Sequence, residues 1–344
     1  VTLNKDYSKH PTQVLMKHLL DPLLVKEINE YNKTHNTTFG YNYSSLFALK
    51  QKRKSEPERN KDGEIIKTKD GDDYYTYEYE DKFALEDTED GKDILKWAFE
   101  NIISKNENKS TIMKDVEKTQ SACGSRKSSV ESPKLVIVYM PTHTGNNNIV
   151  QLQITAKRFI EEHTLWPSYN VEYSNAKNTS GDVIEKEYND DIKNMMEKTK
   201  RNGKRACMLF LGQKGSVGIT YHDCDVTISL DDGHNLDNQK QRYSRALTEA
   251  EGKTVGINVD MNVQRTYLNL MDIIHKYRKN TNTTKTNAEI LYYLYEENIF
   301  LFNPQQFNNG KTTTANIKSY YQTEAENILK EIDDTALLEN IVCD

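Results

Sequence analysis

Continuous apolar runs alternate with amphipathic stretches along the central part of this chain. Residues 134–140 (KLVIVYM) form a run of the kind found in strands that are buried on both faces of a sheet. Further short apolar runs predict four more strands, at 169–173, 205–211, 225–230 and 254–259.

The segments between these runs have helical patterns. Amphipathic periodicity predicts helices over 148–163 and 262–279, and a more polar helix is expected over 182–200. Strands that alternate with helices are joined by right-handed crossovers, so we expect an α/β fold with a mainly parallel sheet flanked by helices.

The N-terminal region has a weaker pattern. Apolar residues recur at roughly helical spacing from Val14 to Ile28, and residues 93–103 (DILKWAFENII) predict a helix around Trp97. Between them, Asp70-Gly71 separates two β-prone stretches and predicts a hairpin. Residues 118–132 are rich in Ser, Lys and Gly and predict a flexible linker.

The expected organisation therefore has three parts. Residues 1–132 are interpreted as the end of a preceding lobe, or an inserted region, with its linker. Residues 133–280 hold the parallel sheet. Residues 281–344 form a helical extension, with helices expected at 287–296 and 316–338.

Composition limits the possible classes of function. The net charge of −6 gives no overall attraction to nucleic acid, so any such binding must use local patches. The four cysteines have no CxxC or regular spacing, which predicts free thiols in a reducing, intracellular compartment. No apolar run reaches membrane-spanning length and no signal peptide opens the sequence. The first residue is Val1 rather than Met, which suggests that the chain continues upstream.

A glycine-rich turn follows the strand at 205–211. In GQKGSVGI, the residues Gly215, Ser216 and Gly218 would lie at the carboxyl end of a parallel strand, where open α/β sheets bind their ligands. Glycine lets backbone N–H groups approach a phosphate without interference from a Cβ atom. A tight turn that needs positive φ explains the same residues equally well.

A Gln/Arg segment follows the next strand. Gln241, Arg242 and Arg245 are expected to begin a helix at the same edge of the sheet. An arginine directed at a γ-phosphate held by another lobe neutralises the charge that develops in phosphoryl transfer. Taken singly, each arginine is better explained by a solvated basic helix end.

The order strand, GQKGSVGIT, strand, QKQRYSRAL resembles the later motifs of superfamily 2 helicases and translocases, in their viral and chromatin-remodeller branches. The resemblance covers residues 134 to about 280 and implies a RecA-like domain, the second of two lobes. It implies that the glycine turn couples nucleic-acid contact to ATP and that the Gln/Arg helix supplies an arginine finger, for which Arg245 is favoured. Polar groups after the first strand, here Thr142 and His143, would hold the phosphate backbone of DNA or RNA.

The sequence departs from this family in two ways. Against the pattern Q-x-x-G-R-x-x-R, read from Gln241, Ser244 replaces the glycine and Thr248 stands where the second arginine belongs. In addition, no Gly-x-x-x-x-Gly-Lys-Ser/Thr loop occurs, so this chain alone should not hydrolyse ATP. ATP and Mg²⁺ would be bound mainly by an N-terminal RecA-like lobe of the same polypeptide.

Two other functions stay open. A catalytically inactive RecA-like module for binding or scaffolding would explain the losses at Ser244 and Thr248. An independent nucleotide-binding enzyme is disfavoured because no phosphate-binding fingerprint follows the first strand. The sequence does not distinguish DNA from RNA.

Three further motifs are set aside. Asp231-Asp232-Gly233-His234 resembles a Mg²⁺-binding box but follows the glycine turn, so we interpret it as an acidic loop that ends a strand. Gly310-Lys311-Thr312 has neither the first glycine of a P-loop nor a preceding strand. The residues His222 to Asp225, taken with His234, lack metal-ligand spacing, and no metal site is expected. Two basic runs, at 50–54 and 198–205, predict solvated faces more readily than nucleic-acid contacts.

Overall fold

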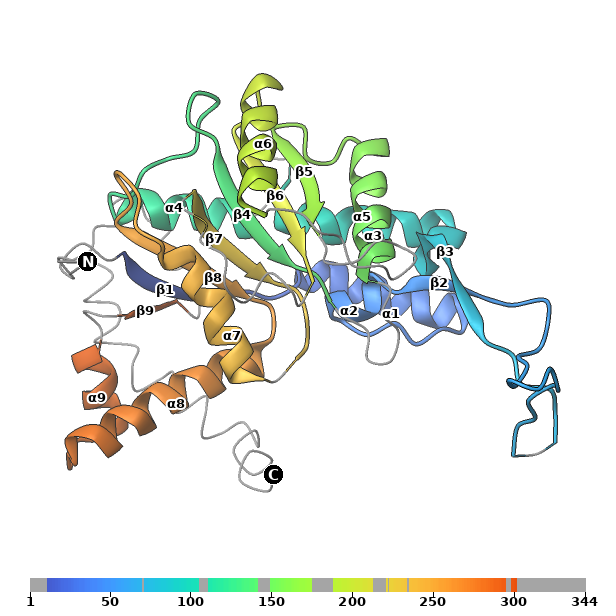
Figure 1. Ribbon diagram of the computed structural model, residues 1–344. Helices are drawn as coiled ribbons and strands as arrows, with labels where there is room; N and C mark the ends of the chain where they lie inside the picture. Colours follow the sequence, from blue (N-terminus) through green and yellow to red (C-terminus); the bar gives the residue numbers. More distant parts are fainter. Residues whose placement is uncertain are drawn as a thin grey trace.

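A seven-stranded, all-parallel sheet forms the centre of the molecule (Figure 1). The structure is a computed structural model. It describes residues 11–69, 71–104, 111–141, 149–174, 188–212, 221, 223–233, 235–294 and 298–301, without the side chains of 188–190, 292 and 298–301. The strand order is β5-β6-β4-β7-β8-β1-β9. This sheet, flanked by helices, confirms the predicted RecA-like α/β class.

The central strands are fully buried. Every residue is buried in β4 (Lys134–Tyr139), β6 (Ala206–Leu211), β7 (Cys224–Ser229) and β8 (Val255–Asp260). Strands β4 and β6 are almost wholly apolar, whereas β7 and β8 each have one apolar face and one face with buried polar residues. The outer strands are β5 (Tyr169–Ser174), β1 (Thr12–Lys17) and β9 (Asn298–Leu301). All five strands predicted from the apolar runs are present.

Helices cover both faces of this sheet (Figure 1). Alternate residues of β4 point to opposite sides. Val136 and Val138 belong to the core that includes α5 (Ile149–Glu162), and Leu135 and Ile137 pack toward α6 (Tyr188–Arg201). Beyond β7 come α7 (Leu236–Tyr243), the 3₁₀ helix η4 (Ser244–Leu247), α8 (Val263–Thr281) and α9 (Asn287–Tyr293). No helix in the described part of the chain is long and apolar enough to cross a membrane.

The N-terminal region shares the core of the sheet. Phe47 stacks on Phe99 with ring centroids 4.5 Å apart, and Phe99 stacks on Phe159 of α5 at 5.6 Å. Trp166 Nε1 donates to the carbonyl of Phe99 at 3.2 Å. The elements of this region are α1 (Pro22–His35), α2 (Tyr43–Leu46), β2 (Leu49–Arg53), β3 (Tyr77–Phe83), the 3₁₀ helix η2 (Ala84–Asp87), α3 (Glu89–Ile102) and α4 (Ile112–Ala122).

The helix expected from Val14 to Ile28 was wrong over its first part. Residues 12–17 form β1, which pairs in parallel with β8 from Thr12↔Val255 to Lys17↔Asp260. The helix begins only at Pro22, where the side chain of Asp21 caps it by accepting from the Leu23 N–H. Apolar residues on both sides of this junction imitate one continuous helical stripe.

The expected flexible linker at 118–132 was also wrong in its physical character. Residues 118–122 complete α4, and Arg126 forms an ion pair with Asp225 of β7 at 2.7 Å. Lys134 also pairs with Asp225, at 2.6 Å, and Lys253 lies 3.7 Å away. Burial lowers the pKa of Lys134 and of Lys253 despite this carboxylate. The segment is therefore attached to the amino edge of the sheet.

The predicted hairpin is present in part. Gly71 adopts a positive φ of 91°, and Lys67 pairs with Asp73 across the turn. The strand β3, which follows this turn, forms its antiparallel ladder with β2 and not with the stretch directly before the turn. Residues 1–10, 295–297 and 302–344 lie outside the described part, and with them the helix expected at 316–338.

We expect Gly256→Ala to destabilise the fold because η4 lies directly against β8 at this residue. A Cβ atom on Gly256 would come within 2.1 Å of the carbonyl oxygen of Ala246. The free energy of unfolding should fall by about 1–3 kcal/mol or more, measured by urea denaturation. Gly40→Ala is the matched control, since its nearest contact is an ordinary 3.4 Å to Ser45. Equal urea midpoints for the two variants would contradict the close approach.

Candidate functional site

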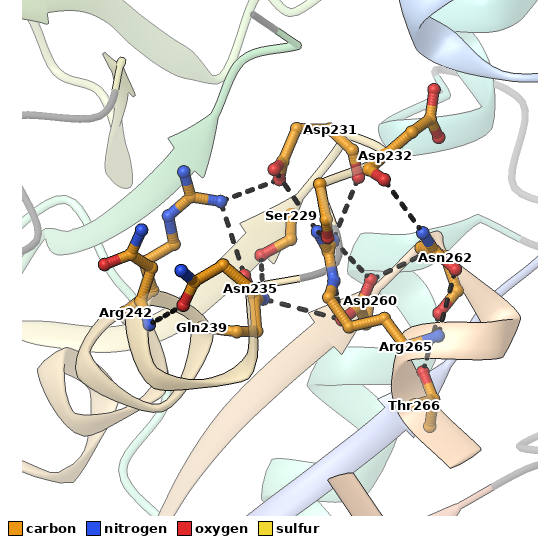
Figure 2. A network of polar contacts seen from close by, with 12 residues as sticks. Ser229, Asp231, Asp232, Asn235, Gln239, Arg242, Asp260, Asn262, Arg265 and Thr266 are labelled. Carbon is orange, nitrogen blue, oxygen red and sulfur yellow. Dashed lines mark hydrogen bonds and ion pairs between the residues drawn. The ribbon is translucent and has the colours of Figure 1, made fainter. Parts of the chain in front are cut away.

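The carboxyl ends of β7 and β8 carry a buried polar network (Figure 2). Helix α7 starts after Asn235, whose side chain accepts from the Asn238 N–H at 3.0 Å. Helix α8 starts after Asn262, whose side chain accepts from the Arg265 N–H at 3.0 Å. Because neighbouring parallel strands end at the same edge, both helix starts lie together where α/β sheets bind ligands.

Arg265 lies at the centre of this network and is 1% exposed. Its Nε and Nη2 donate to the two carboxylate oxygens of Asp260, both at 2.8 Å. Its Nη1 also donates to Asp231 at 3.2 Å and to the Gly233 carbonyl at 2.6 Å. Burial alone would lower the pKa of this guanidinium, but Asp260 and Asp231 hold the pKa above its usual range. Arg265 therefore joins α8 to the ends of two strands.

Arg242 approaches Asp231 from the other side. Its Nη1 donates to Asp231 at 2.8 Å and to Gln239 Oε1 at 3.3 Å. The guanidinium lies over the ring of Tyr139, with its Cζ 4.7 Å from the ring centroid, and the residue is 6% exposed. Arg242 and Arg265 thus share one carboxylate (Figure 2).

Arg245 lies on η4 and is less buried than Arg242. Its Cζ is 5.9 Å from the centroid of the Tyr221 ring. The close contact of η4 with Gly256 fixes the height of this helix above the sheet. Each of the two predicted arginines therefore has an aromatic ring beneath it.

Gln241, the predicted glutamine, is exposed, and its backbone carbonyl accepts from Ser244 Oγ at 2.7 Å. The glutamine in the network is Gln239, which donates to Ser229 Oγ at 2.6 Å. Helix periodicity accounts for the difference. With the start of α7 at Leu236, positions 239, 242 and 243 share the inward face, and all three are buried.

The other predicted site residues lie outside the described part of the chain. These are Gly215, Ser216, Gly218, Thr142 and His143. Among the described residues, no group of His, Cys, Asp and Glu is arranged to hold a metal ion. The predicted basic runs contain several paired cations, such as Lys198 with Glu172 and Lys50 with Asp87.

Sequence reasoning missed Arg265, Gln239 and Asp260, although one signal was present. Asp231 and Asp260 each come at the end of an apolar run, so the topology places two carboxylates at one edge. The motif pattern also fits a second register. Its two arginines are three residues apart, as are Arg242 and Arg245, with Asn238 at the glutamine position and Gln241 at the glycine position.

Comparisons with known proteins give solved structures only. No family model matches the chain, and no curated protein matches it. It is similar to the C-terminal part of the Fun30 ATPase domain, with 13% identity, a TM-score of 0.27 and coverage of 64% of this chain and 56% of that one. It is similar to the Sulfolobus solfataricus SWI2/SNF2 ATPase core in complex with dsDNA, with 12% identity, a TM-score of 0.30 and coverage of 78% and 45%.

A third similar structure is the Mycobacterium smegmatis helicase Lhr bound to ssDNA and AMP-PNP. It has 15% identity and a TM-score of 0.25, with coverage of 54% of this chain and 22% of that one. The chain thus spans 22–56% of the length of these structures. At such values the functional assignment depends on the residues of the site.

We expect Tyr243→Phe to lower the free energy of unfolding by about 1.5–3 kcal/mol at neutral pH. The Tyr243 hydroxyl donates to the buried Asp260 carboxylate at 2.5 Å. Urea denaturation of the wild type and of Tyr243→Phe measures the loss. Equal free energies of unfolding would contradict a buried hydrogen bond from this hydroxyl to Asp260.

The same pair of proteins should differ in pH dependence. Burial, and then the negative charge of Asp260, raises the pKa of Tyr243 well above 10.0. A raised folded-state pKa means that the stabilisation is complete below the unfolded pKa and is lost as the pH rises toward the folded pKa. The difference between wild type and Tyr243→Phe should therefore be roughly 1.4 kcal/mol smaller at about pH 11 than at about pH 9. A constant difference would contradict the raised pKa.

Proposed function

We propose that this chain is the second, arginine-bearing lobe of an ATP-dependent nucleic-acid helicase or translocase. In this function it closes over a nucleotide held by a P-loop lobe and grips the backbone of DNA or RNA. Cycles of closure and opening step the protein along a strand.

The observation that carries this proposal is the placement of Arg242 and Arg245. Both lie beside the carboxyl edge of a parallel sheet, on consecutive elements, and each lies over a tyrosine ring. Guanidinium groups stabilise the negative charge on a transferring phosphoryl group when they are held in place before the reaction. Two arginines held beside the carboxyl edge of the sheet in this way would suit the binding of a polyphosphate.

The two arginines have different roles in this proposal. Arg245 is the arginine finger, because it is less buried than Arg242. Arg242 binds a phosphate oxygen after leaving Asp231. The second register of the motif, which has arginines at both arginine positions but Asn238 and Gln241 in place of its glutamine and glycine, supports this pairing.

ATP and Mg²⁺ fit the residues present only in part. Two guanidiniums suit the γ-phosphate, and in the described part of the chain no carboxylate cluster is arranged to hold Mg²⁺. In this proposal the partner lobe binds the metal and most of the nucleotide, because this chain has no P-loop. When bound, ATP would supply the phosphoryl group, and closure over the bound nucleotide would bring Arg245 to it before hydrolysis. Gly215, Ser216 and Gly218 couple closure to the nucleic acid, while Thr142 and His143 hold its phosphates through sequence-independent, salt-sensitive contacts.

We expect Arg245→Ala to lower kcat for nucleic-acid-stimulated ATP hydrolysis by about 10³-fold or more. The measurement uses a preparation that contains this chain together with its P-loop lobe. Binding of fluorescent single strands, measured by anisotropy at several salt concentrations, should be retained because Arg245 faces the nucleotide.

Arg278→Ala is the matched control. It removes an arginine from the far end of α8, where it donates to Asn287 at 2.6 Å, and it should leave kcat unchanged. Equal turnover in Arg245→Ala and wild type would reject the motor and leave the binding or scaffolding module.

A further inference from the structure

We infer that Asp231 and Arg265 are positioning residues for Arg242. Asp231 holds the Arg242 guanidinium until a nucleotide phosphate replaces it, and Arg265 keeps Asp231 paired after that exchange. The inference rests on the proposed function and deepens it by naming the residues that hold one of its arginines in readiness.

The geometry of Asp231 is the first support. Its Oδ1 accepts from Arg242 at 2.8 Å and its Oδ2 from Arg265 at 3.2 Å, so each oxygen serves one arginine (Figure 2). A carboxylate and a phosphate offer a guanidinium the same kind of acceptor. Asp231 therefore occupies, within the chain, the role that a phosphate oxygen would take.

The unequal attachment of the two arginines is the second support. Arg265 donates to Asp260 through Nε and Nη2 and to the backbone carbonyls of Asp231 and Gly233. Arg242 has the Asp231 carboxylate, a 3.3 Å contact with Gln239 and the face of Tyr139. In an exchange of partners, Arg242 is the arginine that leaves and Arg265 the one that stays.

The cost of burying charge explains why a second arginine is needed. A buried carboxylate that loses its only partner is strongly destabilising. Asp231 is 5% exposed, and with Arg265 in place it keeps one charged donor when Arg242 departs. The exchange is therefore reversible without leaving an unpaired charge.

A double-mutant cycle in the full chain, without nucleotide, tests the arrangement itself. Arg242→Met should lower the urea midpoint only slightly, because Arg265 still serves Asp231. In an Arg265→Lys background the same substitution should lower the midpoint distinctly more, since an ammonium cannot make the same paired contacts. Equal shifts in the two backgrounds would overturn the inference, whatever the ATPase does.

Kinetics with the P-loop lobe present tests the exchange. Asp231→Asn should lower KM for ATP by about tenfold, because phosphate no longer competes with a charged acceptor for Arg242. Asp232→Asn is the matched control. It removes the same charge from the neighbouring residue, whose carboxylate points away from both arginines (Figure 2).

The outcomes distinguish a failure of the partner exchange at Asp231 from a failure of the proposed function. A fall in KM for Asp231→Asn but not for Asp232→Asn supports the exchange. Equal changes in both variants would reduce the effect to charge removal and overturn the inference. If Arg245→Ala retains full turnover, the proposed function fails and the exchange fails with it, while a positive double-mutant cycle would still describe a structural pair.

Discussion

The paired contact between Arg265 and Asp260 is the constraint on which the candidate site depends. It joins the end of β8 to the start of α8, and Arg265 also holds the loop at Asp231 by donating to the side chain and the backbone carbonyl of that residue. Buried ion pairs are weak contributors to net stability, since desolvation offsets much of their attraction. Here the pair fixes geometry. It sets where Asp231 stands, and Asp231 sets where Arg242 stands.

Around this pair, the chain separates two kinds of charge. The amino edge of the sheet buries one carboxylate, Asp225, beside the cations of Arg126, Lys134 and Lys253. The carboxyl edge balances Asp231 and Asp260 against Arg242 and Arg265. In α/β folds the carboxyl edge is the one that meets ligands, so the amino edge has the character of a structural anchor. Arg126, which lies in the stretch that the sequence predicted to be a linker, is part of that anchor.

The sequence predicted the sheet well and the site unevenly. Strands such as β4 and β6 are apolar on both faces, and this signal depends on nothing beyond the local sequence. The N-terminal strand was missed because β1 is followed after a short break by the amphipathic helix α1, and the combined pattern matched a helix. Arg242 and Arg245 were predicted as site residues because their spacing is local, and the structure places both beside the carboxyl edge of the sheet.

Gln239 and Arg265 could not be found in the same way. Which glutamine faces inward depends on where α7 begins. The helix begins at Leu236, more than one turn before the expected start at Gln241, and Gln239 rather than Gln241 lies on its inward face. The contact of Arg265 with Asp231 joins segments that are distant in sequence and depends on the capping of α8 by Asn262. Contacts of this kind follow from three-dimensional packing and leave no periodic trace.

The placement of β1 has a consequence for how the chain folds. Thr12 pairs with Val255, and the described segment of β9 pairs with the other side of β1, so the strand lies between partners that are synthesised much later. Parallel pairing over such a distance closes a long loop and is slow. During synthesis the apolar side chains of Val14, Leu15 and Met16 would stay unpacked until β8 has been synthesised. A fragment cut at the start of β4 would in turn leave the edge of β8 without its neighbour and open to pairing with other chains.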